Sequence, residues 1–374
     1  MHNYVIESQI GAGKFGKVYK GFNKINKNAV AIKVENWIDS LEGKNRFSLL
    51  KNEATVINYL CLNKCPNIPK IYWYGKSQKE TGMSLIETFL NGGSLLEKVS
   101  NLYGFSVACE GKLTFLAEAS PKPKMNFSKQ SAEKLDLYIN RIMQKMIYII
   151  KNVHDLQVIH RDIKPHNFMF SGKIEEGELY LIDFGLATFV DDFKIEENKE
   201  EHIIGTPNYI SYFIHDGCSP SKCDDLISIG YIYLFLRSKY LLWDKKNTNF
   251  SSEQSGDKKN TNFSSEQSGD EKNRIFSSKQ SEDEKEFHVD CEDKSGLPPS
   301  HILHPNNQRI KKFKEIHFLN ENICFDKREP IIQYMNYLYH FSSFHSEKLF
   351  GLSVACEGKF RKINYEELIN LFRG

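Results

Sequence analysis

The sequence lacks both a strong net charge and a long hydrophobic run. Its 374 residues carry 50 lysines and arginines against 48 aspartates and glutamates, a formal net charge of +2. So small a surplus creates no field that would attract nucleic acid or a membrane surface, and neither is expected as a partner. The most apolar window, residues 226–243, is broken by Arg237 and Lys239. It is too short and too polar for a membrane span and predicts a buried helix.

The cysteines are scattered, and no leader segment is visible. The chain has eight cysteines, and Cys61 and Cys65 form a lone C-x3-C with no partner pair, so we expect free thiols rather than a metal site. The opening residues, MHNYVIESQIGAG, show no basic segment followed by an apolar core. The sequence therefore predicts an intracellular protein without a signal peptide, in the cytoplasm or nucleus, or in a host cell or virion if the source is a virus.

Strands are predicted in the first part of the chain and helices in the second. Strand patterns occur at 4–10, 17–22, 30–34, 68–74 and 83–89, and one helical pattern lies among them at 46–60. Further helical patterns follow at 134–155, 225–237, 330–341 and 365–372. This order is typical of an α+β fold, here with a boundary near Asn91-Gly92-Gly93, which we predict to be a flexible break.

Repeated segments interrupt this order. Residues 246–284 contain a thirteen-residue repeat, KNTNFSSEQSGDK, in three copies of decreasing fidelity. A second motif, GFSVACEGK at 104–112, returns as GLSVACEGK at 351–359. We interpret these segments as insertions at 103–131, 246–300 and 346–360, placed in loops where extra length costs little stability. The tandem repeat has too few apolar residues to offset its ordering entropy, so disorder is predicted for it.

A glycine-rich turn lies between the first two predicted strands. Gly11, Gly13 and Gly16 form a G-x-G-x-x-G pattern, completed by Ala12, Lys14 and Phe15. Glycines allow backbone N–H groups to approach phosphate oxygens, because no Cβ is in the way. A dinucleotide-binding fold is the alternative. Glu35 lies about 20 residues downstream, where that motif has an acidic residue that binds the ribose. The alternative requires a helix after the last glycine, but residues 17–22 are strand-like.

Two charged residues occur in apolar surroundings. Lys33 ends the strand-like Val-Ala-Ile-Lys segment, and Glu53 lies among apolar residues of the predicted helix at 46–60. An unpaired buried charge is costly, so each residue would compensate the other, and the pair would hold Lys33 against nucleotide phosphates. The alternative is an exposed surface lysine and an ordinary helix acid.

The densest group of chemically useful residues is VIHRDIKPHN at 158–167. Asp162 can orient an alcohol nucleophile and accept its proton, and Lys164 can neutralise charge on a transferring phosphoryl group. Asn167 and Asp183, the first residue of a later Asp-Phe-Gly, can bind Mg²⁺ through oxygen atoms. A lone His-Arg-Asp or a lone Asp-Phe-Gly occurs by chance. All of these elements in this order indicate phosphoryl transfer, a reaction that depends on positioning and charge neutralisation.

Together these motifs resemble those of eukaryotic-type protein kinases. Lys164 after His-Arg-Asp-Ile is typical of the serine/threonine branch. Five further segments are similar to the casein kinase 1 family: Asn167-Phe168-Met169, Gly-Thr-Pro-Asn-Tyr at 205–209 in place of an Ala-Pro-Glu motif, the paired aspartates within 219–231, and two closing helices at 337–340 and 364–372. The resemblance covers roughly residues 1–100, 132–245 and 310–374 and leaves out the repeats.

The resemblance implies a two-lobed kinase fold with a small antiparallel β-rich N-lobe at 1–90 and a larger helical C-lobe at 91–374. It also implies a role for residues around the adenine: a roof of Ile10, Val18 and Ala31, a floor of Met169, and a hinge from Glu87 to Phe89 whose backbone reads the adenine edge. Asp225 would support the catalytic loop from below. Its other interpretation, a helix N-cap, is compatible with that role.

The sequence departs from the family between Asp183 and Gly205. Thr188 is the only hydroxyl side chain there, and the loop at 191–201 is rich in aspartate and glutamate. Arg161 precedes the catalytic aspartate, and kinases with an arginine there often need a phosphate to pair with it. We hypothesise that Arg161 needs no phosphate partner, either because carboxylates of the loop can pair with it or because, as in the resembling family, no such partner is needed. A solvated acidic loop without a regulatory role is the alternative. The family's substrate-reading arginine is replaced by Asn208, which predicts at most a weak preference for phosphorylated substrates.

The sequence therefore predicts an ATP- and Mg²⁺-dependent serine/threonine protein kinase that acts on protein hydroxyls as a monomer. The first alternative is a pseudokinase or scaffold that binds nucleotide and protein partners, whose usual signature is loss of Lys33, Asp162, Asn167 or Asp183. All four are present. The second alternative, an ATP-dependent kinase of a small molecule, conflicts with the helical segments that resemble casein kinase 1.

Overall fold

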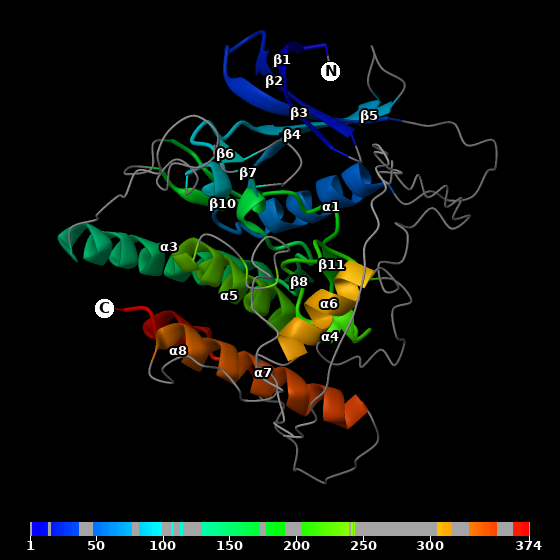
Figure 1. Cartoon of the computed structure of the whole chain (residues 1–374). Coiled ribbons are helices and arrows are strands. Elements are labelled where there is room, and N and C mark those ends of the chain that lie inside the picture. Colours follow the sequence, from blue (N-terminus) through cyan, green and yellow to red (C-terminus); the bar gives the residue numbers. More distant parts are fainter. Residues whose placement is uncertain are drawn as a thin grey trace, which may run out of the picture.

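The structure is a computed structural model of the whole chain (Figure 1). The described residues are 2–13, 16–36, 48–76, 82–98, 106–107, 113–114, 129–172, 177–190, 203–238, 241, 243, 305–315, 329–349 and 362–373. The tip of the glycine turn, most of the acidic loop and the whole tandem repeat lie outside them. Of the first insertion, only the paired strands β6 (Ser106–Val107) and β7 (Leu113–Thr114) and the start of α3 are described.

The N-terminal part is a five-stranded antiparallel sheet with one helix beneath it (Figure 1). The strand order is β1-β2-β3-β5-β4, formed by β1 (Tyr4–Gly13), β2 (Gly16–Asn23), β3 (Ala29–Asn36), β5 (Gly82–Thr88) and β4 (Ile71–Lys76). Helix α1 (Leu49–Leu62) is capped by Ser48, whose hydroxyl accepts from the backbone N–H of Lys51. Leu50 and Ala54 pack against Leu85 of β5 and so fix α1 beside the sheet.

The C-terminal part is helical and is built around α5 (Lys222–Ser238). Nearly every residue of this helix from Cys223 to Leu236 is buried, as expected for a helix that is apolar on all sides. It packs between α3 (Lys129–Asp155) and α7 (Pro330–Leu349), and the short α8 (Tyr365–Asn370) closes the same core against α3 (Figure 1). The sequence prediction of a buried helix from this window is confirmed. None of the helices in the described ranges is both long and apolar enough to cross a bilayer.

Short elements between the two parts carry the candidate site. Strand β8 (Val158–Ile159) pairs with β11 (Thr188–Phe189), and β9 (Phe168–Phe170) pairs with β10 (Leu179–Leu181). A 3-10 turn, η1 (Pro165–Asn167), separates β8 from β9. Helices α4 (Tyr212–His215) and α6 (Pro305–Lys314) complete the described elements.

The predicted elements are present, but several of their ends differ. Helix α3 begins at Lys129 rather than Lys134, inside the segment assigned to the first insertion, and α7 runs to Leu349 instead of ending at Phe341. The added residues, 129–133 and 342–349, are mostly polar in sequence, so the apolar pattern does not extend over them and underestimates both lengths. Helix α4 and strands β9, β10 and β11 were not predicted because they are too short to show a period. Helix α6 has ten residues, but Ile310 and Phe313 are too few apolar side chains to form a helical stripe.

The predicted flexible break at Asn91-Gly92-Gly93 is instead bonded to β9. Gly92 N donates to Phe170 O at 2.8 Å, and Phe170 N donates to Gly93 O at 3.0 Å. A Cβ at Gly92 would lie 2.1 Å from the carbonyl oxygen of Gly172 and 2.5 Å from that of Phe170. Glycine is needed here for close backbone packing between the two parts of the chain.

Replacement of Gly92 by alanine is therefore expected to lower the free energy of unfolding by about 1–3 kcal/mol, since two backbone oxygens would have to move. The measurement is the urea midpoint of the purified variant. Gly172→Ala is the matched control, because a Cβ there meets nothing closer than 3.9 Å. An equal loss in both variants would show that the close approach at Gly92 is not what constrains this junction.

Candidate active site

The predicted pair of Lys33 and Glu53 is present beneath the sheet. Lys33 Nζ lies 2.5 Å from Glu53 Oε1, and both side chains are largely buried. Burial acts to lower the pKa of Lys33, but the carboxylates of Glu53, Glu87 and Asp183 outweigh burial and raise it above its usual value. Lys33 is therefore a permanent cation that reaches from β3 toward α1, placed where a polyanion could be bound.

The glycine turn joins β1 to β2 as a hairpin. Gly11 is opposite Val18, Ala12 opposite Lys17, and Gly13 opposite Gly16. A Cβ at Gly16 would lie 2.1 Å from the carbonyl oxygen of Val34, so the turn packs onto β3. Because a strand rather than a helix follows the last glycine, the dinucleotide-binding alternative is wrong for this chain.

Four of the other residues expected around a nucleotide lie on four different strands. Ile10 is half exposed on β1, Val18 lies on β2, Ala31 is buried on β3, and Met169 lies on β9. Lys14 and Phe15 lie outside the described residues. Contacts of any of these residues with a base stay predictions.

The catalytic loop brings Asp162 and Lys164 together, with Thr206 from the segment that follows the acidic loop. Lys164 Nζ donates to Asp162 Oδ2 at 2.6 Å and to Thr206 Oγ1 at 3.2 Å. Thr206 Oγ1 in turn donates to Asp162 Oδ1 at 2.6 Å. In the sequence Thr206 stands out only as part of a family motif, whereas in the structure it is a direct partner of the candidate base.

These contacts keep Asp162 ionised. Burial acts to raise the pKa of Asp162, but the charge of Lys164 and the hydrogen bonds from Lys164 and Thr206 outweigh it and lower the pKa below its usual value. The carboxylate is thus available at neutral pH to accept a hydrogen bond from an alcohol and then its proton.

Asn167 and Asp183 offer oxygen atoms suited to a divalent cation. Asn167 Nδ2 donates to the backbone oxygen of Asp162 at 2.8 Å, which leaves the side-chain carbonyl oxygen available as a ligand. Asp183 has a φ of +67°, a strained backbone conformation for a residue other than glycine. Among the described residues no group of three or more His, Cys, Asp or Glu forms a complete metal site. Two protein oxygens completed by phosphates match the way Mg²⁺ is usually held.

Helix α1 holds the Asp-Phe-Gly turn directly. Asn52 Nδ2 donates to the carbonyl oxygens of Gly185 at 2.9 Å and Ala187 at 2.8 Å. Asn52 is next to Glu53 in the sequence, so the same helical turn positions the partner of Lys33 and the candidate metal-binding turn. A lone asparagine in a helix gives no sequence signal for this role.

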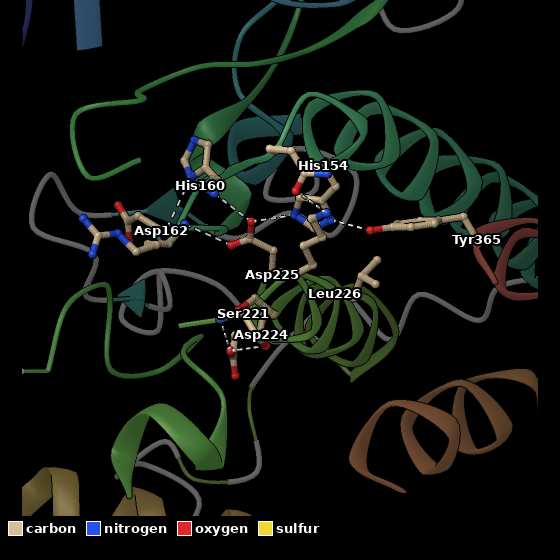
Figure 2. A network of polar contacts seen from close by, with 12 residues as sticks. His154, His160, Asp162, Ser221, Asp224, Asp225, Leu226 and Tyr365 are labelled. Carbon is tan, nitrogen blue, oxygen red and sulfur yellow. Dashed lines mark hydrogen bonds and ion pairs between the residues drawn. The ribbon is translucent and has the colours of Figure 1, made fainter. Parts of the chain in front are cut away.

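A buried carboxylate holds the catalytic loop from below, as Figure 2 shows. Asp225 Oδ2 accepts from the backbone N–H of His160 at 2.7 Å and from His154 Nε2 at 3.0 Å. Asp225 Oδ1 accepts from the backbone N–H of Arg161 at 3.0 Å. Arg161 has a φ of +68°, and these bonds hold it in that strained conformation. The support role expected of Asp225 matches these contacts.

The same network reaches the last helix of the chain. Because a carboxylate only accepts, His154 Nε2 carries the proton, and in the neutral ring Nδ1 accepts from the hydroxyl of Tyr365 at 2.6 Å. Figure 2 shows Tyr365 and Asp225 on opposite sides of the His154 ring. Neither His154 nor Tyr365 was given a role from the sequence, because their partners are distant in the chain.

Asp224, next to Asp225, takes the capping role instead. Its Oδ2 accepts from the backbone N–H of Ser221 at 2.7 Å, just before α5 begins, and its Oδ1 accepts from Ser211 Oγ at 2.5 Å. Asp225 lies inside the first turn of α5, so its N-cap interpretation is wrong. The paired aspartates divide two tasks: one fixes the start of α5 and of α4, and the other fixes the catalytic loop.

Comparison with known proteins agrees with this geometry. The family model for the protein kinase domain matches residues 4–295. The chain belongs to the protein kinase family. This kinase is 31% identical over 247 residues to casein kinase I homolog 3 of Schizosaccharomyces pombe, and the matched region covers 64% of this chain and 47% of that protein. It is 28% identical over 247 residues to casein kinase I homolog 1 of Saccharomyces cerevisiae, and that matched region covers 64% of this chain and 39% of the relative.

The kinase chain therefore spans less than half of the length of these two relatives. The similarity to casein kinase I proteins confirms the resemblance inferred from the catalytic loop and the Gly-Thr-Pro-Asn-Tyr segment. The two-lobed kinase fold predicted from the motifs is confirmed by the family match together with the β-rich and helical parts of the structure.

Replacement of Asp225 by asparagine is expected to weaken the catalytic loop. An amide turns one accepting oxygen into a donor that faces N–H groups, so about 1.5–3 kcal/mol of stability should be lost, and kcat for casein phosphorylation should fall about tenfold or more. Urea midpoints and initial rates measure the two effects.

Asp216→Asn serves as the control for this variant, because Asp216 pairs with Lys311 at 2.6 Å on the surface. Its effect on stability should stay within about 0.5 kcal/mol. Indistinguishable stability and rate in the two variants would contradict the support role of Asp225.

Proposed function

We propose that this chain is an ATP-dependent serine/threonine protein kinase of the casein kinase 1 kind. The observation that carries the proposal is the arrangement of Asp162, Lys164 and Thr206 around one ionised carboxylate. It supplies a proton acceptor and a neutralising cation at one place. The pair of Lys33 and Glu53 supplies a phosphate-binding cation beneath the glycine turn.

The reaction is a transfer of the γ-phosphoryl group to a side-chain hydroxyl. Asp162 orients the hydroxyl and accepts its proton as the oxygen–phosphorus bond forms, while the bond from the γ-phosphorus to the bridging oxygen breaks and ADP leaves. Lys164 neutralises charge on the transferring group, and Lys33 binds the phosphates that remain on ADP. Bound through Asn167 and Asp183, Mg²⁺ would neutralise further phosphate charge.

We also propose that no activation-loop phosphate is required. Arg161 Nε already donates to the carbonyl oxygen of Leu186 at 2.6 Å, so the arginine before the catalytic aspartate is engaged without a phosphate. Thr188, the one hydroxyl candidate, lies in β11 opposite Ile159. A phosphate there would have to fit against the β8–β11 pair. The acidic loop proposed as an alternative partner lies outside the described residues.

Other features of the proposal rest on the sequence alone. Asn208 replaces the family's substrate-reading arginine, and its backbone oxygen accepts from Trp243 Nε1 at 3.1 Å. A weak preference for phosphorylated substrates, a monomeric state and an intracellular site stay predictions.

The function is tested with an Asp162→Asn variant. Its transfer of phosphate from labelled ATP to casein in the presence of Mg²⁺ should fall about 100-fold or more, because the proton acceptor is lost. Its affinity for ATP, measured by calorimetry, should stay close to that of the parent protein.

Asp136→Asn is the matched control, since Asp136 pairs with Arg237 at 3.0 Å on the surface. It should transfer phosphate at the parent rate. A parent protein that binds ATP but labels no casein would instead support the pseudokinase alternative.

Treatment with a broad phosphatase, followed by its removal, should leave the rate of casein phosphorylation unchanged. The reason is that Arg161 is held by a backbone carbonyl rather than by a phosphate. Mass spectrometry before and after treatment checks that phosphate was removed. Loss of activity together with a phosphate mapped to Thr188 would overturn this part of the proposal.

A further inference from the structure

A second carboxylate contacts Lys33 from within the sheet. Glu87 lies on β5 opposite Ala31 of β3, and Lys33 lies opposite Leu85. Because alternate residues of a strand share a face, the side chains of Glu87, Ala31 and Lys33 project from the same face of the sheet. Glu87 Oε1 lies 3.0 Å from Lys33 Nζ, and the Glu87 side chain is only 4% exposed. From the sequence, only the backbone of Glu87 was expected to have a role, as part of a hinge.

The two carboxylates hold Lys33 through different elements. Glu53 reaches it from α1, which is fixed to the sheet by side-chain packing. Glu87 reaches it from β5, which is hydrogen-bonded to β3 along the whole ladder from Val30 opposite Thr88 to Asn36 opposite Gly82. A displacement of α1 would break the first contact and leave the second intact. Lys33 therefore keeps one partner whenever the sheet is folded.

Within the described part of the chain, only one of the two carboxylate oxygens of Glu87 has a partner. Its second oxygen, Oε2, is buried and has no hydrogen-bond partner among the described residues. An unpaired buried polar atom costs about 1–3 kcal/mol, and more when it is charged. Burial raises the pKa of Glu53 against the attraction of Lys33, and the negative charges of Glu87 and Asp183 add to the effect of burial. An apolar side chain of similar size would fill the same space without these costs.

We propose that Glu87 is a positioning residue for the reaction: it holds Lys33 in the phosphate-binding orientation independently of α1. This inference rests on the proposed kinase function. It makes Glu53 and Glu87 partly redundant partners of one cation, so neither carboxylate alone should be as important as Lys33 itself.

The proposal is tested by a double-mutant cycle with Glu53→Gln and Glu87→Met, measured as kcat and KM for ATP with casein as acceptor. Glu53→Gln alone should lower kcat/KM for ATP about tenfold, since Glu87 still holds Lys33. The same change in a Glu87→Met background should lower it about 100-fold or more, because Lys33 then loses both carboxylates that contact it. Glu87→Met alone should raise KM for ATP more than it lowers kcat.

The thermal stability of Glu87→Met distinguishes a positioning role of Glu87 from a merely structural one. Glu87→Met should raise the thermal midpoint while it weakens ATP use, since it removes an unpaired buried oxygen. Ser84→Ala is the matched control on the same strand. Ser84 Oγ is also buried without a partner, but it belongs to the alternate face, opposite Val34. This control should raise the midpoint without any change in KM for ATP.

The possible outcomes distinguish failure of the proposed role of Glu87 from failure of the proposed kinase function. Equal effects of Glu53→Gln in both backgrounds, or an unchanged KM for ATP in Glu87→Met, would overturn the role of Glu87 while the kinase function stands. Glu87→Gln provides a second variant of nearly the same shape, and it should show the same direction of change in KM. If the parent protein transfers no phosphate at all, the function fails. Calorimetry with ATP and Mg²⁺ then still reports whether Glu87→Met weakens nucleotide binding.

Discussion

The site depends on one buried carboxylate that holds the backbone of the catalytic loop. Asp225 accepts hydrogen bonds from the N–H groups of His160 and Arg161, and His154 gives it a third donor. These bonds fix the backbone immediately before Asp162, at a residue whose left-handed φ would not persist unsupported. The position of the candidate base is therefore set by a residue on the central helix α5, which is anchored in the core by α3 and α7.

The opposite side of the site is governed by charge rather than by backbone geometry. Lys33 lies between two buried glutamates, and an aspartate that is predicted to bind metal adds to the negative charge around it. Apolar residues would pack there without the free-energy cost of burying charge. The cluster therefore lowers stability but holds the Lys33 cation in a fixed position. A nucleotide triphosphate with its metal ion matches what this cluster and the glycine turn together offer.

The sequence predicted what depends on local pattern and on chemically distinctive residues. Lys33 with Glu53 and the residues of VIHRDIKPHN were identified because a charge in an apolar run, or several polar types at close spacing, requires an explanation. Contacts made by ordinary residues across long sequence separations were not accessible: Asn52 on the Asp-Phe-Gly turn, Thr206 on Asp162, and Tyr365 on His154. The side-chain contact of Glu87 was not accessible for a related reason, since only the strand register shows which face its side chain takes.

The most direct test of the central claim is phosphoamino-acid analysis of casein incubated with this protein, Mg²⁺ and γ-labelled ATP, beside a Lys33→Met form. The account predicts label on serine or threonine with the parent protein and none with the variant, because both the acceptor site at Asp162 and the phosphate-binding cation are required. Binding of ATP without label in casein, or equal label from the Lys33→Met form, would contradict it.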